Sequence, residues 1–147
     1  MKLYILNGPN LNMLGIREPD CYGRVSYEAL TNIIKEKCDT LGIEPVIYQS
    51  NHEGDLVDKI QEAYFSGADG IVINPGAYTH TSIALLDAVK AVSLPTVEVH
   101  ISDVDNREDF RRVSYIRQAS EKTISGKGID GYTEAIDYLF ERLGGKK

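Results

Sequence analysis

The chain has 147 residues, a net charge of −6 and a sequence pI near 5.0. A chain of this length forms one domain that buries roughly 70% of the surface its unfolded form exposes. The acidic balance argues against a nucleic-acid or anionic-membrane partner, because both surfaces require clustered Lys and Arg side chains.

The two cysteines, Cys21 and Cys38, have neither zinc-site nor redox-motif spacing. The N-terminal apolar run, in MKLYILNGPN, is too short for a signal peptide. Nothing in the sequence approaches the roughly 20 apolar residues that span a bilayer. We therefore expect a soluble protein of the reducing cytoplasm that contacts no membrane.

Five apolar, β-branched runs predict strands, at residues 3–6, 46–48, 70–73, 96–100 and 123–125. Each is followed by a helical pattern. The first pattern begins at a cap, Ser26, and stops at Gly42. Its apolar residues recur at helical spacing and are Leu30, Ile33, Ile34, Cys38 and Leu41.

Four further helices are predicted from the same spacing. The second runs from about residue 54 to 66, with Leu56, Ile60, Ala63 and Tyr64 facing inward. The third begins near Thr81 or Ser82 and buries Ala84, Leu85, Ala88, Val89 and Val92 before Pro95. The fourth covers about residues 107–119. The fifth covers about residues 132–143, with Ala135, Ile136, Leu139 and Leu143 on one face.

Strict alternation of strands and helices predicts an α/β fold, in which a parallel sheet has helices on both faces. The best fit is a flavodoxin-like three-layer sandwich with five strands in the order 2-1-3-4-5, formed by residues 1–147 as a single domain. In that order a ligand binds at the carboxyl ends of the strands, where the winding reverses between strands 1 and 3.

Three polar, loop-forming segments lie directly after strands 1, 3 and 4, at residues 7–23, 74–82 and 98–112. The loop after strand 2, QSNHEGD, is also polar but is expected farther from the point where the winding reverses. Glycines and prolines break any regular structure in residues 7–23. The apolar residues Leu11, Met13, Leu14 and Ile16 favour an ordered lid over a disordered insert.

The three segments contain proton-transfer groups, cations and hydrogen-bonding groups: Tyr22, His80 and His100; Arg17, Arg107, Arg111 and Arg112; and Asn10, Asn12, Asn74, Ser82 and Ser102. No metal-ligand set is visible, since the chain has three histidines and none has the i, i+4 spacing of a helical zinc site. No phosphate-binding loop is visible either, because GKG at residues 126–128 is too short. We expect no cofactor.

Tyr22 is either a surface aromatic or a general base whose phenolate is favoured by the nearby Arg17 guanidinium. Cys21, beside the same arginine, is an alternative nucleophile without a paired histidine. His100 is either a buried core residue or a general acid. Glu98 lies two residues earlier on the same strand face and can orient the His100 imidazole.

Asp87 lies two helical turns after His80, as either a solvated charge or an interface residue beside Leu85 and Leu86. The run containing Arg107, Arg111 and Arg112 is either a solvated helix face or contributes one arginine to a site.

Four segments together, NGPNLNMLGIREPDCYG, QSNHEGDLVDKI, INPGAYTHTSIALLDA and EVHISDVDNREDFRR, resemble type II 3-dehydroquinate dehydratase, also called type II dehydroquinase. The resemblance covers nearly the whole chain. It implies a flavodoxin-like subunit that assembles as trimers, commonly four of them in a homododecamer. It also implies a cofactor-free lyase, a hydro-lyase, that converts 3-dehydroquinate to 3-dehydroshikimate in the shikimate pathway of aromatic amino acid biosynthesis or in the quinate pathway.

The resemblance also implies residue roles. Tyr22 matches the general base, Arg17 the arginine that activates it, and Asn10 the residue that holds a water near the enolate oxygen. His100 matches the general acid and Glu98 its orienting partner. The other matches are for substrate binding: Asn74 and the backbone amides of Ile101 and Ser102 for the carboxylate, His80 and Arg111 for the ring hydroxyls, and Asp87 for the neighbouring subunit's site.

This sequence departs from the family pattern at secondary positions. Leu86 stands where an arginine often precedes Asp87, and Asp105 and Asn106 replace the usual His-Ala before Arg107. These departures concern assembly rather than proton transfer. A flavodoxin-like binding or signalling domain without catalysis is the alternative reading. A receiver domain requires acidic residues after strand 1, where this chain has Asn7 and Gly8, and a flavin or nucleotide binder requires a phosphate loop.

Overall fold

The computed structural model describes residues 1–18, 20 and 24–145. Within these residues, five strands form one parallel sheet in the order β2-β1-β3-β4-β5. The strands are β1 (Lys2–Asn7), β2 (Glu44–Gln49), β3 (Gly70–Asn74), β4 (Thr96–His100) and β5 (Lys122–Ser125). The predicted flavodoxin-like fold and strand order are confirmed.

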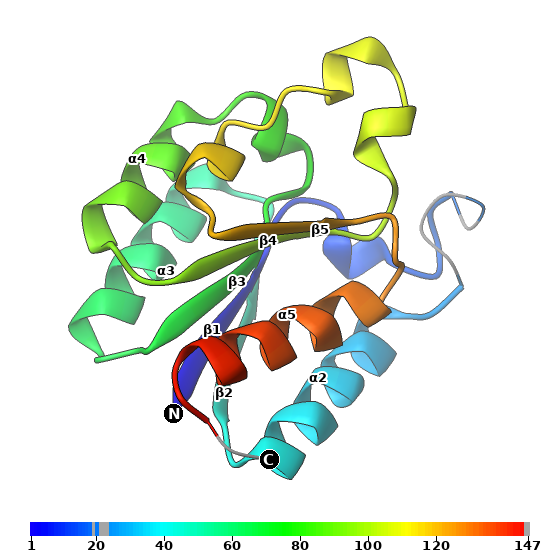
Figure 1. The fold of residues 1–147 in the computed structure, drawn as a ribbon. Helices are drawn as coiled ribbons and strands as arrows, with labels where there is room; N and C mark the ends of the chain where they lie inside the picture. Colours follow the sequence, from blue (N-terminus) through cyan, green and yellow to red (C-terminus); the bar gives the residue numbers. More distant parts are fainter. Residues whose placement is uncertain (19, 21–23, 146–147) are drawn as a thin grey trace.

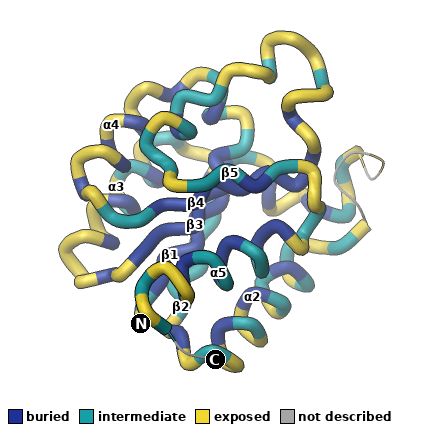
Figure 2. The backbone as a smooth tube through the Cα atoms, in the orientation of Figure 1, coloured by how far each residue is buried: buried dark blue, intermediate teal, exposed yellow. Residues whose placement is uncertain are grey.

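Helices cover both faces of this sheet (Figure 1). The helices α2 (Tyr27–Leu41) and α5 (Asp130–Arg142) pack on one face, and α3 (Glu53–Phe65) and α4 (Ile83–Val92) pack on the other. Every residue of β3 and β4 is buried, as Figure 2 shows in dark blue. Central strands of a parallel sheet are covered on both sides, which explains their nearly continuous apolar sequences.

Side-chain caps are present at two helices, and those of α2 were predicted. The Ser26 hydroxyl accepts a hydrogen bond from the Ala29 N–H over 3.1 Å at the start of α2. Gly42 ends that helix in the left-handed conformation, with φ of 67°. At the start of α4 the Ser82 hydroxyl accepts from the Leu85 N–H over 3.0 Å. Ser82 therefore serves as a cap, which fixes the start of α4 directly after the β3 loop.

The helix predicted over residues 107–119 is wrong. Among the described residues this region contains short 3-10 turns instead: η3 (Val104–Asn106), η4 (Asp109–Arg111) and η5 (Ile116–Ala119). The segment rises above the sheet in yellow in Figure 1. Its sequence is charged and places only Ile116 of residues 107–119 in the core, so no apolar stripe can hold an α-helix against the sheet.

Two predicted core residues are also wrong. Tyr64 is 56% exposed, because it lies one position beyond the Leu56, Ile60 and Ala63 stripe of α3. Ala84 is exposed on the solvent side of the first turn of α4. In the same turn of α4, both Leu85 and Leu86 are buried within the subunit.

Candidate active site

A cleft of about 690 Å³, open to solvent, lies at the carboxyl ends of β1, β3 and β4. All three loops predicted to meet there contribute to its walls. The predicted site residues that line it are Asn10, Arg17, Asn74, His80, His100, Ile101, Ser102, Arg107 and Arg111.

The β1 and β3 loops pack backbone to backbone beneath the cleft. The Gly8 N–H donates to the Asn74 carbonyl over 2.8 Å. A Cβ atom on Gly8 would lie 2.4 Å from the Pro75 carbonyl oxygen, so no side chain fits there. Gly76 has φ of +60°, and a Cβ on it would lie 3.0 Å from the Pro9 oxygen. Glycine is therefore required at both contacts.

Asn10 is held by the loop after β2. Asn10 has φ of 69°, and its N–H donates to the Asn51 Oδ1 over 3.0 Å. The Gln49 Nε2 donates to the Gly8 carbonyl over 3.2 Å, and the Tyr78 hydroxyl donates to the Asn51 carbonyl over 2.7 Å. This loop was expected farther from the site, but β2 pairs with β1, so the two loops leave the sheet side by side.

Part of the predicted lid is packed. Leu11 and Leu14 are buried, whereas Met13 is 38% and Ile16 is 72% exposed. Asn12 does not line the cleft; its Oδ1 accepts from the Gln49 Nε2 over 3.3 Å. Tyr22 and Cys21 lie outside the described residues, so their predicted roles stay predictions.

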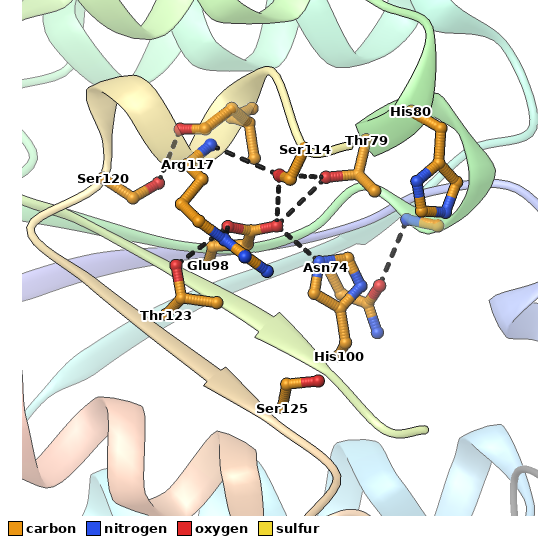
Figure 3. Close-up of polar contacts among 12 residues, drawn as sticks. Asn74, Thr79, His80, Glu98, His100, Ser114, Arg117, Ser120, Thr123 and Ser125 are labelled. Carbon is orange, nitrogen blue, oxygen red and sulfur yellow. Dashed lines mark hydrogen bonds and ion pairs between the residues drawn. The ribbon is translucent and has the colours of Figure 1, made fainter. Parts of the chain in front are cut away.

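Glu98 and His100 form a buried pair at the end of β4. Glu98 is 0% and His100 is 4% exposed. The His100 Nε2 lies 2.5 Å from the Glu98 Oε1, as the period-two spacing of a strand predicts (Figure 3). Because Nε2 faces the carboxylate, Nδ1 is the ring nitrogen left for a ligand in the cleft.

The Glu98 carboxylate accepts three further hydrogen bonds (Figure 3). Hydroxyls of Thr79 and Ser114 donate to Oε1 over 3.0 Å and 2.6 Å, and the Thr123 hydroxyl donates to Oε2 over 3.0 Å. The Arg117 Nε lies 3.6 Å from Oε2. Sequence reasoning missed all four residues, because single polar residues with no periodicity do not reveal which buried carboxylate they contact.

These donors determine the charge of Glu98. Burial alone would raise the pKa of this carboxyl, but the hydrogen bond and charge of His100, with the hydroxyl donors, lower the pKa to about 2. Glu98 is therefore a carboxylate at neutral pH. A carboxylate is only an acceptor, so the shared hydrogen lies on the His100 Nε2.

His80 is held as a neutral imidazole with one defined tautomer. Its Nδ1 donates to the Val113 carbonyl over 2.7 Å, since a carbonyl oxygen can only accept. Burial lowers the pKa of His80, and the charges of His100 and Arg111 lower it further, although the Val113 contact opposes them. The Nε2 of His80 is then a hydrogen-bond acceptor at the cleft wall.

The main chain after β4 is fixed by the turn at residues 126–128. The Ile101 carbonyl accepts from the Gly128 N–H over 3.1 Å, and the Ser102 carbonyl accepts from the Gly126 N–H over 3.2 Å. Both glycines have positive φ. The GKG sequence, too short for a phosphate loop, therefore shapes the cleft wall formed by Ile101 and Ser102.

Arg17, Arg107 and Arg111 line the mouth of the cleft. Arg17 pairs with Glu18 at 3.2 Å, and the Arg111 Nε pairs with Glu108 at 2.8 Å. One arginine of this run was predicted to lie in a site, and two of them, Arg107 and Arg111, line the cleft. Arg112 is the exception: it does not line the cleft, its side chain is 62% exposed, and it pairs with Asp109.

Asp87 is exposed on α4 and does not line the cleft of its own subunit. The apolar neighbours Leu85 and Leu86, predicted to favour an interface beside Asp87, are buried in the subunit core and offer no interface surface.

The described residues contain no cluster of three His, Cys, Asp or Glu side chains that could hold a metal ion. No helix among them is both long and apolar enough to cross a membrane.

A family model described as dehydroquinase class II matches residues 1–140. A 3-dehydroquinate dehydratase of Caldicellulosiruptor bescii is 54% identical over 142 residues, which cover 97% of this chain and 98% of that protein. One from Rhodopseudomonas palustris is 51% identical over 142 residues, covering 97% of this chain and 94% of that protein.

Solved structures show the same similarity. The crystal structure of type II dehydroquinase from Butyrivibrio crossotus superposes with a TM-score of 0.94 at 56% identity, and the match covers 95% of this chain and 97% of that chain. A 3-dehydroquinate dehydratase-like protein from Bifidobacterium longum superposes with a TM-score of 0.72 at 28% identity, covering 97% of this chain and 98% of that chain.

Proposed function

Since this chain belongs to the class II dehydroquinase family and is an enzyme of the 3-dehydroquinate dehydratase type, we propose that it dehydrates 3-dehydroquinate to 3-dehydroshikimate through an enolate. In this proposal Tyr22 is the general base and His100 the general acid. The observation that supports it best is the Glu98–His100 pair, buried at 2.5 Å on the wall of an open cleft.

The reaction needs a base, a site for negative charge and an acid. The base removes a proton from the carbon next to the ketone, and the electron pair moves onto the ketone oxygen to give an enolate. When the ketone re-forms, a carbon–carbon double bond forms and the hydroxyl on the next carbon leaves. Hydroxide is a poor leaving group, so a proton from the acid must convert it to water.

His100 suits the role of acid because its two ring nitrogens have separate tasks. Nε2 donates to the Glu98 carboxylate, which holds the ring in one orientation. The negative charge of Glu98 also balances the positive charge of the doubly protonated ring. Nδ1 then carries the proton that goes to the leaving hydroxyl. After transfer, the neutral ring keeps the Nε2 hydrogen and its bond to Glu98.

The cleft walls supply complementary groups for the substrate. The Asn74 amide and the backbone N–H groups of Ile101 and Ser102 bind the carboxylate, while the His80 Nε2 and Arg111 bind ring hydroxyls. Asn10 holds a water at the enolate oxygen. Hydrogen-bond donors that face a developing oxyanion lower the barrier to its formation.

Tyr22 is assigned as the base from the sequence motif alone. An unperturbed tyrosine has a pKa of about 10, so only about one molecule in a thousand is phenolate at neutral pH. A guanidinium favours the phenolate. Arg17, which lines the cleft, is the cation that activates Tyr22 in this proposal.

The deciding experiment is an assay with 3-dehydroquinate in which the conjugated enone product is followed by ultraviolet absorbance. We expect product from the wild-type enzyme and almost none from Tyr22→Phe. The matched control is Tyr64→Phe, at an exposed tyrosine on α3, which should keep full activity. No enone from wild type would reject the function, and near-normal turnover of Tyr22→Phe would reject this base.

No lysine occurs in residues 7–23, 74–82 or 98–112. A mechanism through a Schiff base needs a lysine amine. Borohydride added together with substrate should therefore leave the activity intact, and irreversible inactivation would contradict the enolate mechanism.

For assembly, the family resemblance supports trimers, four of which form a dodecamer, with Asp87 of one subunit reaching its neighbour's site. Asp87 is exposed and outside its own cleft, as this role requires. Light scattering distinguishes the dodecamer from a trimer alone, and a fully active monomer would contradict both.

A further inference from the structure

Behind the cleft wall, a row of buried polar side chains joins the ends of β1 and β3 to the first turn of α5. We call it the Asn7–Tyr132–Asn74 row. Asn7 and Asn74 are paired neighbours in the β1–β3 register, and Tyr132 packs against both from α5. Asn7 and Tyr132 are 0% exposed and Asn74 is 4% exposed. A buried row of this kind is fixed only if its hydrogen bonds agree in direction.

The contacts of Tyr132 determine that direction. Its hydroxyl lies 2.6 Å from the Asn7 Oδ1, which can only accept, so the single hydroxyl hydrogen is donated to Asn7. The hydroxyl oxygen therefore accepts at its other contact, where the Asn74 Nδ2 donates over 2.9 Å.

The other end of the Asn74 amide is fixed as well. The Gly76 N–H donates to the Asn74 Oδ1 over 3.1 Å. Turning the amide over would place a donor against that N–H, so Tyr132 and Gly76 define one orientation. An amide nitrogen carries two hydrogens. Tyr132 takes one, and the second remains for a ligand in the cleft that Asn74 lines.

We propose that Tyr132 is a positioning residue for substrate binding, whose hydroxyl holds the Asn74 amide so that its second Nδ2 hydrogen meets the substrate carboxylate. This inference rests on the proposed role of Asn74 in binding that carboxylate. Tyr132 does not line the cleft, so it acts only through Asn74.

A positioning role differs measurably from a purely structural one. The substrate carboxylate is present in the ground state and in the transition state, so a poorly held Asn74 weakens binding of both. Such a change raises KM and leaves kcat nearly unchanged. A hydroxyl that only stabilises the fold changes the unfolding midpoint and neither kinetic constant.

The first variant is Tyr132→Phe, which keeps the ring in the core and removes only the hydroxyl. We expect KM for 3-dehydroquinate to rise about tenfold, equivalent to about 1.4 kcal/mol, with kcat within about twofold of wild type. The matched control is Tyr4→Phe. Tyr4 is 2% exposed, and its hydroxyl contacts Glu62 at 2.8 Å and Ser66 at 2.9 Å on the α3 side of the sheet, away from the cleft. The control should lower stability and leave KM unchanged.

A second measurement tests whether the variant has lost affinity for the carboxylate of the ligand in particular. Quinate and quinamide have the same ring, one with a carboxylate and one with a carboxamide, and each is tested as a competitor of the substrate. The wild type should prefer quinate, and Tyr132→Phe and Asn74→Ala should both reduce that preference.

The outcomes separate this inference from the proposed function. If Asn74→Ala raises KM and Tyr132→Phe behaves like Tyr4→Phe, the positioning role is overturned and the proposed carboxylate site stands. If Asn74→Ala leaves KM unchanged, the carboxylate site and the inference both fail, although the enone assay can still establish the activity.

Should Tyr132→Phe not fold, Asn7→Leu carries the test. Leucine has the same branched shape as asparagine, is somewhat larger, and removes both the Oδ1 acceptor that directs the Tyr132 hydroxyl and the buried Asn7 Nδ2. We expect KM to rise about threefold, in line with the loss of one hydrogen bond. An unchanged KM in the folded Asn7→Leu enzyme would overturn the inference.

Discussion

The two walls of the cleft are held by different interactions. The wall formed by β3 and β4 carries Asn74, Glu98 and His100, which are at most 4% exposed and are joined to their surroundings by buried hydrogen bonds. The second set of lining residues, which we call the arginine wall, has side chains 16–31% exposed, whose ion pairs reach exposed carboxylates: Arg17, Arg107 and Arg111.

This difference corresponds to a difference in stiffness. A buried donor or acceptor that loses its partner costs about 1–3 kcal/mol, so the Glu98 wall has one favourable arrangement. Exposed ion pairs contribute little and are screened by salt, so the arginine wall can rearrange when an anionic ligand arrives. The proposed proton delivery, which needs fixed geometry, thus lies on the stiff wall, and the proposed attraction of the anionic substrate lies on the adaptable one.

The largest expected effect is on the stiff wall, at His100. Replacing His100 with Ala removes the proposed acid and should lower kcat about 1000-fold, within the range known for general acid catalysis. Glu98 keeps its three hydroxyl donors, so the variant should fold. Turnover together with a thermal melt checks both points, and a loss smaller than tenfold would remove His100 from proton transfer.

The next largest effect concerns acid stability and Glu98. Its pKa is about 2 in the folded protein against an ordinary 4.5. A carboxyl whose pKa is lower in the folded state stabilises the fold above pH 4.5 and loses that contribution as the pH falls toward about 2. The contribution is on the order of 3 kcal/mol.

The measurement is urea unfolding at pH values from 7 down to 2, with Glu98→Gln compared to wild type. The Gln variant should show a smaller loss of stability between pH 4.5 and 2. Glu36→Gln, at an exposed position of α2, is the control and should follow the wild-type curve. Parallel curves for Glu98→Gln and wild type would show that Glu98 is not what makes the fold acid-sensitive.

A direct comparison of the two walls comes from Ser114→Ala and Glu108→Gln. Ser114 donates to the buried Glu98, so its loss should cost about 2 kcal/mol of unfolding free energy. Glu108 is exposed and pairs with Arg111, so its loss should leave the unfolding midpoint unchanged. Equal effects of the two changes would mean that the walls do not differ in stiffness.

A further prediction concerns catalysis on the arginine wall, at Arg17. If Arg17 lowers the pKa of Tyr22, Arg17→Ala should move the basic limb of the pH–activity profile to higher pH and lower kcat at neutral pH about tenfold for each pKa unit. Arg17→Lys should restore part of the activity, because an ammonium keeps the charge without the planar fork. An unchanged pH profile would reject the activation.

Local patterns in the sequence predicted much of this architecture. The alternation of strands and helices predicted the strand order. The separation of two residues on one strand predicted that Glu98 lies beside His100. Ser26 and Gly42 marked the ends of α2. The family assigned from four segments is confirmed by the family model and by relatives more than 50% identical. Each of these features depends on residues close together in the chain or on a long motif.

The segment at residues 104–119 could not be predicted in this way, because its shape depends on distant partners. The Tyr115 N–H donates to the Thr79 carbonyl over 2.9 Å, and the Val113 carbonyl accepts from His80. Ser114, between them, reaches Glu98. A charged run without an apolar stripe gives no sign of such contacts, so a helix was predicted where the chain instead follows the edge of the site.

The bond between Tyr132 and Asn7 joins residues 125 positions apart, in the last helix and the first strand. During synthesis β1, β3 and β4 leave the ribosome before α5 does, so the sheet can pair while Asn74 still lacks its partner from α5. Contacts between such distant residues form late, because a long loop must close first. The Asn74 side of the cleft is therefore complete only when the C-terminal helix docks. If Asn74 binds the substrate as proposed, the time at which substrate affinity recovers during refolding reports when that helix docks.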